Sequence, residues 1–415
     1  MNQLHEWSFV LVSKSPLRIG TDDGDLLLDE DGRPFLPGTS WAGACRAYML
    51  ALDPANEALF GSQGSGSVQQ GSRLIFSDGV CITPQPFEVR PRVKLDRATR
   101  TVGKEKFGQM TVAAGAKFRV KLTLRTDNVK DKERVERMLH ALHSGIIRLG
   151  AYKSTGGGRM AIEDGRYVGY DFAKREDLEA YVEESKPADE WKPMELDPDG
   201  VLCIDIAGEL AGPMLIAGQY PLDSNKPDRT PVWSEYDGEP RYIIPATSLK
   251  GALRHQTVRI IRAIGADPSL EEHLFEGRIM LEDILLEEPK TKIYHRVAIN
   301  PLTGGNKDGA LLDEETVTGK FTAGLHLRYD DSERDQAAAA LVLLALRDLA
   351  EGRQTLGSGQ GIGRGNVRLS SLRMRYGDRT VEIDFVRRSV HDPYGWMAEL
   401  QRSLDACVKK EGEAG

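Results

Sequence analysis

Cysteine is scarce in this sequence, with only four residues among 415. No two of them share a CxxC spacing, which argues against a zinc finger and against a framework of disulfides. The eight histidines form no HxH or HxxxH pair, so a metal centre built on histidine is not expected. We therefore expect buried thiols at Cys45, Cys81, Cys203 and Cys407.

Long apolar runs are absent as well. Residues 7–12 form the first run, which is too short for the apolar core of a signal peptide and has no small-residue cleavage site after it. The longest later run, residues 337–346, is about half as long as a membrane span. The expected location is cytoplasmic, with no membrane contact.

An excess of positive charge is also missing, because the formal net charge is −8. Phosphate contacts need a basic field, so this balance argues against bulk, non-specific binding of nucleic acid. The acidic residues are clustered, however, and residues 90–106 are basic, which leaves room for a local basic groove. The length and apolar content are those of a globular protein with two sizeable cores.

One short pattern is present twice. Residues 34–46 read PFLPGTSWAGACR, and residues 242–254 read YIIPATSLKGALR. The shared prolines, Pro37 and Pro245, lie about half of the chain length apart, so we interpret the chain as two copies of one unit. In each copy a Thr-Ser pair offers a hydroxyl N-cap, and the helix that follows begins beside basic residues. Such a helix N-terminus is a ready anion site.

Each half is predicted to run strand, helix, strand, excursion, strand, helix, Gly-rich loop and strand. Residues 117–126 alternate as a strand, and residues 129–149 have the spacing of an amphipathic helix. The basic excursion, residues 88–112, is interpreted as a β-hairpin. This order is close to a split βαβ unit, so the expected fold class is α+β with two tandem ferredoxin-like, RRM-like domains.

The predicted domain boundaries follow from the repeat. The first domain spans residues 1–172, an acidic, proline-bearing linker spans 173–200, and the second domain spans 201–415. The second domain is expected to carry an additional helix at about residues 392–410. Residues 221–238 are interpreted as an acidic loop.

Both halves contain a Gly-rich loop after the second helix. Residues 150–160 read GAYKSTGGGRM, and residues 356–366 read LGSGQGIGRGN. Glycine lets a backbone approach phosphates closely and present its N–H groups to them. Neither loop fits the Walker A or the GxGxxG pattern. The alternative is a tight turn that packs a helix against a strand. This alternative is less favoured because the Gly-rich loop occurs at matched positions in both halves.

Acidic loops supply candidates for metal binding or base catalysis. Solvated loop charge is the usual explanation of such residues, and a structural role is expected for the two histidines near basic positions, His255 and His295. The acidic candidates are Asp22, Asp23 and Asp25 in the first half and Asp223 and Asp228 in the second.

Taken together, the paired motifs resemble the RAMP superfamily of CRISPR-associated proteins. Residues 37–46 and 244–254 are similar to the family pattern IPGSSLKGxxR, and the elements that begin at Arg92 and Arg296 are similar to each other and to the family. The resemblance covers nearly the whole chain, once per half. It is to the backbone subunit of type III effector complexes, in the tandem form of subtype D.

The resemblance implies a subunit that stacks with other RAMP-family subunits along a guide crRNA. Each half would place a β-hairpin thumb, at about residues 92–110 and 296–318, across the guide–target duplex and displace a nucleotide at six-nucleotide intervals. The target RNA would be cut opposite each displaced base by a loop aspartate, with Mg²⁺ or Mn²⁺. The resemblance thus implies a metal-dependent endoribonuclease.

Motif position then assigns the residues. The first-half aspartate is Asp23, six residues before Asp29, and it is also the expected metal ligand, with Asp22 and Asp25 beside it. The residues expected to bind RNA lie in the motif helices, the thumbs and the Gly-rich loops: Thr39, Ser40, Arg46, Arg92, Lys153, Gly156, Gly157, Gly158, Arg159, Thr247, Ser248, Lys250, Arg254, Arg296, Gly359, Gln360, Gly361 and Arg364.

The chain departs from the family pattern at two places. The count that gives Asp23 reaches residues 229–231 in the second half, and one or two inserted residues would bring Asp228 into position. Trp41 and Ala42 replace the Leu-Lys of the motif, so the second half is expected to grip the guide more firmly. A scaffold without nuclease activity and a guide-processing, histidine-dependent ribonuclease are the two alternatives.

Overall fold

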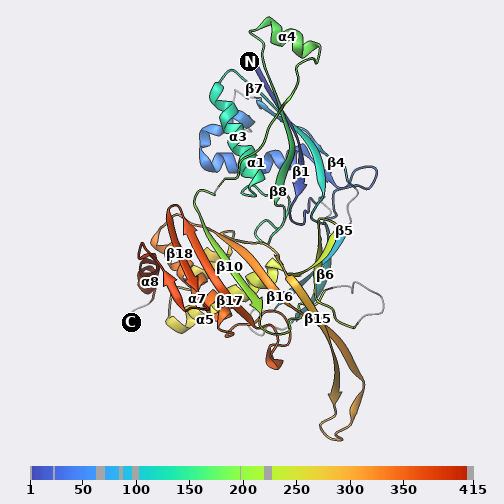
Figure 1. The fold of residues 1–415 in the computed structure, drawn as a ribbon, viewed down its shortest axis with the longest axis vertical. Helices are drawn as coiled ribbons and strands as arrows, with labels where there is room; N and C mark the ends of the chain where they lie inside the picture. Colours follow the sequence, from blue (N-terminus) through green and yellow to red (C-terminus); the bar gives the residue numbers. More distant parts are fainter. Residues whose placement is uncertain are drawn as a thin grey trace.

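The computed structural model describes residues 2–21, 24–61, 71–83, 87–95, 102–196, 198–218 and 227–408. The chain forms two bodies, and each is an antiparallel sheet with helices packed on one face (Figure 1). The α+β class and the two-part organisation expected from the sequence are therefore confirmed. Within the described ranges, every helix is too short or too polar to span a membrane.

The first body is built on the sheet β2-β4-β7-β1-β8-β9, with β3 paired to β7. Its strands are β1 (Gln3–Ser13), β2 (Phe35–Leu36), β3 (Leu74–Phe76), β4 (Gly79–Cys81), β7 (Lys117–Thr126), β8 (Met160–Asp171) and β9 (Asp189–Glu190). Its helices are α1 (Gly38–Leu52), α2 (Glu57–Phe60), α3 (Val129–His143) and α4 (Arg175–Val182). Because β9 pairs with β8, part of the predicted linker belongs to this sheet. The domain boundaries themselves stay a prediction.

The second body is built on the sheet β13-β16-β10-β17-β18-β19, with β15 paired to β16. Its strands are β10 (Val201–Leu210), β11 (Trp233–Tyr236), β12 (Glu239–Ile244), β13 (Ile279–Leu281), β14 (Ile284–Leu285), β15 (Glu287–Ile299), β16 (Asn306–Arg328), β17 (Val367–Tyr376), β18 (Arg379–Asp384) and β19 (Ser389–His391). Its helices are α5 (Ala246–Ile264), α6 (Ser269–Phe275), α7 (Glu333–Ala350) and α8 (Trp396–Ala406).

The two sheets share one central arrangement. Four strands of each sheet correspond, and their order across the sheet is β3-β7-β1-β8 in one and β13-β16-β10-β17 in the other. When only these four strands are numbered along the chain, the order in both sheets is second, third, first and fourth. The match extends to single hydrogen bonds, because Gly158 N donates to Pro16 O and Gly365 N donates to Pro213 O. The duplication inferred from the sequence is therefore confirmed in the structure.

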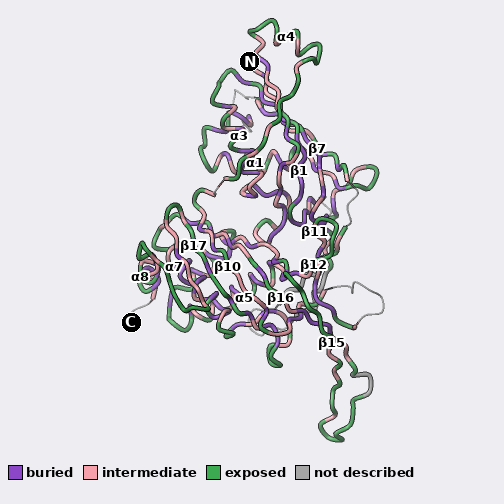
Figure 2. The backbone as a smooth tube through the Cα atoms, viewed as in Figure 1, coloured by how far each residue is buried: buried purple, intermediate pink, exposed green. Residues whose placement is uncertain are grey.

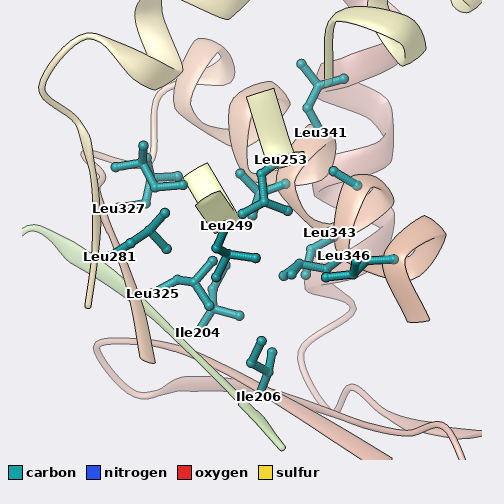
Figure 3. Close-up of a cluster of buried hydrophobic side chains, with 14 of the residues drawn as sticks. Ile204, Ile206, Leu249, Leu253, Leu281, Leu325, Leu327, Leu341, Leu343 and Leu346 are labelled. Atoms are coloured by element: carbon teal, nitrogen blue, oxygen red, sulfur yellow. The ribbon is translucent and has the colours of Figure 1, made fainter. Parts of the chain in front are cut away.

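Each core lies between the sheet and the helices on one of its faces. In the second body, Ile204 and Ile206 of β10 face Leu249 and Leu253 of α5, with leucines of α7 closing the far side (Figure 3). The strands alternate, so that every second residue enters the core. A separate cluster around Trp7 and Trp41 forms the core of the first body.

A β-hairpin extends from each body where the sequence analysis expects a thumb. The first is β5 (Phe87–Leu95) with β6 (Val102–Val112), and the second is β15 with β16. The second hairpin projects well beyond the body, and its far end is exposed (Figures 1 and 2). Both hairpins begin earlier in the chain than predicted, at residues 87 and 287 and not at 92 and 296.

The structure corrects three local predictions. Residues 221–238, interpreted as loop, include strand β11, which pairs with β12. The predicted helix at 129–149 ends at His143. The helices α1 and α5 have Pro37 and Pro245 at their N-caps, with no cap from a side chain of the Thr-Ser pairs.

A buried polar network joins the two bodies at the base of the first hairpin. Arg90 of β5 pairs with Glu88 and with Asp283, and its Nη2 donates to Ser234 Oγ at 2.7 Å. Ser234 Oγ in turn donates to Glu88 Oε2 at 2.6 Å. Burial opposes the charge of Arg90, but Asp283 and Glu88 raise its pKa overall. The first hairpin is therefore fixed to the second body.

Asp283→Ala is expected to destabilise the protein more than Asp78→Ala. Both carboxylates accept a backbone N–H at a helix start, from Ala246 and Gly38 at 2.8 and 2.7 Å. Only Asp283 also pairs with a buried arginine, so its loss should cost about 3 kcal/mol, against about 1 kcal/mol for a cap alone. Urea denaturation of the two variants measures the difference, and equal losses would contradict it.

Candidate nucleic-acid interface

The repeated motif begins each of its helices under a carboxylate of the same chain. Asp78 lies at the N-terminus of α1 and Asp283 at the N-terminus of α5. A carboxylate there interacts favourably with the positive end of the helix dipole. The anion site expected at the start of each helix is therefore occupied in part by a carboxylate of the chain itself. Thr39, Ser40, Thr247 and Ser248 lie in the first turns, and their RNA contacts stay predictions.

The basic side chains of the motif are also engaged within the chain. Arg46 donates to Glu57 at 3.0 Å, and Arg254 donates to Glu271 at 2.6 Å, each on the short helix that follows. Lys250 is half-buried, and burial together with the nearby Arg254 lowers its pKa. These contacts give the spacing that the two copies share a structural role. Guide contacts by the three residues stay predictions.

The first Gly-rich turn packs against the second body. Gly156, Gly157 and Gly158 are buried, and a Cβ on Gly156 would lie 3.2 Å from the backbone of Glu282 and of Asp283. Arg159 pairs with Glu282 at 3.2 Å, beside a closer pair from Arg148. Lys153 is exposed at the edge of this turn. The turn thus serves the contact between the bodies, whether or not RNA also reaches it.

The second Gly-rich turn has an open tip. Gln360 and Gly361 are exposed, in the 3₁₀ segment Gln360–Ile362, and a Cβ on Gly361 would meet nothing within 4 Å. Gly359 precedes this tip with φ of 83°. Arg364 points inward instead and is only 3% exposed. This tip therefore has the exposure that a nucleic-acid contact requires.

Three segments that the sequence analysis singled out separately converge on two residues of β16, Asp313 and Glu314. Asp228 Oδ2 accepts the backbone N–H of Asp313 at 2.9 Å, and Asp228 itself is exposed. Arg296 Nε lies 3.1 Å from Glu314 Oε2, and Arg364 Nη1 donates to the same oxygen at 2.8 Å. The loop that carries Asp228, the strand that carries Arg296 and the second Gly-rich turn therefore meet at the base of the second hairpin.

Arg229 completes this group, since its Nη1 donates to Glu314 Oε1 at 3.4 Å. We call Arg229, Arg296, Glu314 and Arg364 the Glu314 cluster. Glu314 is buried, and the Arg364 guanidinium also stacks over the ring of Tyr294, 5.2 Å from its centroid. The sequence analysis missed Arg229 and Glu314. Only the pairing of β15 with β16 brings residue 314 next to residues 294 and 296.

An exposed histidine lies on the opposite face of the same hairpin. His295 Nδ1 is 2.7 Å from Asp313 Oδ1, and the side chain is 71% exposed. Because Asp228 binds the backbone of Asp313, the loop aspartate and this imidazole are linked through one residue. The sequence analysis expected a structural role for His295. Its exposure leaves Nε2 open to a ligand.

Several candidate residues lie outside the described part of the chain. Asp22, Asp23 and Asp223 belong to segments that the structure does not describe, and of Arg92 only the backbone in β5 is described. Asp25 is described and exposed. Among the described residues, no group of three or more His, Cys, Asp and Glu side chains forms a metal site. Mg²⁺ is often held by one or two carboxylates together with substrate phosphates, a mode that needs no cluster of protein ligands. The metal role of Asp228 therefore stays a prediction.

The open face of the second sheet is a poor platform for bases. A shallow hollow on this face is lined by Asp205, Thr322, Gly324, Ser371 and Arg373, without an aromatic ring. RNA-recognition sheets stack bases on aromatic side chains. The hairpin base is therefore the better candidate for the interface.

Comparison with known proteins supplies one match. A family model described as the RAMP superfamily matches residues 10–161 and, a second time, residues 213–368. Each matched range contains the motif helix, the second long helix and one long strand of a body: α1, α3 and β7 in the first, and α5, α7 and β16 in the second. Among curated proteins, none matches this chain.

Proposed function

The chain belongs to the RAMP superfamily of CRISPR-associated RNA-binding proteins, and we propose that it is a backbone subunit of a type III effector complex that binds guide crRNA and cleaves complementary target RNA. Each body would be one ferredoxin-like RAMP domain, and the strand order of the two sheets supports this. Its partners would be the guide, the target and other RAMP-family subunits.

The convergence at the base of the second hairpin carries this proposal. A hairpin that crosses a guide–target duplex would hold the displaced nucleotide beside its base, where Asp228, Arg229 and Arg296 lie. Guide contacts would be made to the backbone, because base pairing already supplies the sequence specificity. The tandem fold would give one chain two such hairpins at a fixed spacing.

The cut would be an internal transfer at the displaced nucleotide. The 2′-oxygen attacks the adjacent phosphorus as the bond from phosphorus to the 5′-oxygen breaks, which requires both oxygens in line with phosphorus. The products would be a 2′,3′-cyclic phosphate and a 5′-hydroxyl, which takes its proton from water. Asp228, which is exposed, would accept the proton of the 2′-hydroxyl, directly or through water. A Mg²⁺ or Mn²⁺ ion held by Asp228, and by Asp23 in the first half, would neutralise charge that develops on the phosphate oxygens.

Mapping the cuts on a guide-matched target RNA tests the proposal. The assembled complex is expected to cut at six-nucleotide intervals when Mg²⁺ or Mn²⁺ is present. A target that is bound but stays intact would favour the alternative, a structural crRNA-binding subunit without nuclease activity. That outcome would leave RNA binding and the two-domain assignment in place.

His295 favours a second candidate, a histidine-dependent ribonuclease that processes the guide. The Asp313–His295 pair has the geometry of an oriented general base. Incubating the isolated protein with repeat RNA in the presence of a chelator separates this function from the first. We expect the repeat RNA to stay intact, and metal-independent cutting that His295→Gln abolishes would reverse the assignment.

A further inference from the structure

The Glu314 cluster contains more positive charge than is required to balance its one carboxylate. Three guanidinium groups face a single carboxylate, at 2.8, 3.1 and 3.4 Å. The pair of Arg364 with Glu314 already compensates the buried carboxylate, since both side chains are nearly inaccessible. Gathering like charges at a partly buried site is unfavourable unless an anion offsets them. Two arginines are therefore in excess.

The two excess arginines are accessible from solvent. The side chain of Arg229 is 54% exposed and that of Arg296 is 39% exposed. Arg364 contributes a further sign of an incomplete site, because its buried Nη2 has no hydrogen-bond partner among the described residues. A buried donor without an acceptor is costly. Charge, access and an unpaired donor thus occur at one place.

We propose that Arg229 and Arg296 bind one phosphodiester group of RNA at the base of the second hairpin. Glu314 and Arg364 then act as positioning residues, because Glu314 accepts from Arg229 and forms an ion pair with Arg296, and Arg364 anchors Glu314 to the second Gly-rich turn. Guanidinium groups suit this ligand because their planar donors match two phosphate oxygens. The inference rests on the proposed function only in that the anion is RNA.

The neighbouring charges are compatible with this ligand. Asp228 directly precedes Arg229, and its Oδ2 is occupied by the N–H of Asp313. The carboxylate of Asp313 faces His295 on the other side of the hairpin. A phosphate held by Arg229 and Arg296 would thus lie next to the carboxylate proposed to cut, which places a scissile or neighbouring phosphate within reach of Asp228.

A purely structural role is the competing explanation, in which the arginines only fasten the hairpin to the body. Glu314 and Arg364 are enough for that fastening. The two explanations differ in what the loss of a single exposed arginine changes. A phosphate site predicts a change in the salt dependence of RNA binding, whereas a fastening predicts a change in thermal stability alone.

The test measures RNA affinity of the full chain as a function of salt, with a single-stranded guide RNA as the probe. Arg229→Gln and Arg296→Gln are each expected to reduce the slope of log K against log salt by roughly 0.7 to 1, as expected for one lost phosphate contact. Arg402→Gln, an exposed arginine of α8, is the matched control and should leave the slope unchanged. Unchanged slopes in both Arg229→Gln and Arg296→Gln, with the guide alone and with a guide–target duplex, would overturn the inference.

Two further arms make the outcome specific. Glu314→Gln removes the carboxylate that orients Arg229 and Arg296, so it is expected to reduce the slope as well as the melting temperature. A lower melting temperature with an unchanged slope would contradict the positioning role. Repeating the titration with a guide–target duplex shows which strand carries the phosphate. A reduced slope already seen with guide RNA by itself assigns the phosphate to the guide, and a reduced slope seen only with the duplex assigns it to the target. A wild-type protein that binds RNA with the expected slope but never cuts would refute the cleavage proposal and leave this site standing.

Discussion

Asp228→Ala is expected to abolish the cuts made by the second half of the protein and to leave those of the first half in place. Asp23→Ala is expected to do the reverse, and the double variant should cut nowhere. Removing a group that accepts the proton or holds the metal should slow the affected cuts by at least about 100-fold. Mapping the products of a guide-matched target with the assembled complex measures all three.

The control for this prediction is an exposed aspartate away from the hairpin. Asp378, in the turn between β17 and β18, is exposed, and Asp378→Ala should change no cut. Asp22→Ala and Asp25→Ala test the neighbours of Asp23 in the same assay. If Asp228→Ala left every cut intact, the second half would have no role in cleavage, and Asp228 would be the solvated loop charge that its composition also allowed.

Gly365→Ala is expected to destabilise the second body strongly. Gly365 has φ of 78°, and a Cβ there would lie 1.9 Å from Leu356 O, a carbonyl that cannot move away because the Leu356 N–H is bonded to Gly365 O. Strain at positive φ and a clash with backbone together should cost about 3 kcal/mol or more. Thermal unfolding should then begin roughly 6–12 °C lower.

Gly158→Ala is the matching test in the first body, with a Cβ 1.8 Å from Leu149 O, and the same loss is expected. The control is Gly361→Ala, because that glycine has open space around its Cβ and lies at the exposed tip. This change should alter stability by less than about 0.5 kcal/mol. If Gly361→Ala nevertheless weakens RNA binding, the tip contacts RNA; if Gly365→Ala is tolerated, the turn is not the rigid element described above.

Much of the fold could be predicted because its signals are local and repeated. The helix predicted after the second motif, running to about Ile264, is found as α5, which begins slightly earlier, at Ala246. The strand at 117–126 alternates along its whole length and is found as β7. Neither prediction depends on which distant residue lies opposite.

The missed features all depend on long-range pairing. The caps of α1 and α5 come from carboxylates 40 and 37 residues away, so the nearby hydroxyls were the wrong choice. Glu314 lies in an acidic run of β16, and only the register with β15 decides that its carboxylate faces Arg296 and not solvent. A shift by one residue would have reversed the faces of the hairpin.

The charge balance illustrates the same limit. The net charge of −8 argues against bulk, non-specific binding of nucleic acid, and two arginines of the motif, Arg46 and Arg254, are held by carboxylates of the chain. The surplus becomes visible only at the base of the second hairpin, where three arginines share one glutamate. Local arrangement, not composition, determines where an anion can bind.

Crosslinking of a bound guide RNA, with the crosslinked residues and nucleotides identified by mass spectrometry, tests the central claim most directly. Two equivalent RNA-holding bodies predict crosslinks to both hairpins, β5–β6 and β15–β16, at guide positions six nucleotides apart. Crosslinks confined to one body, or to the open face of the second sheet, would contradict it.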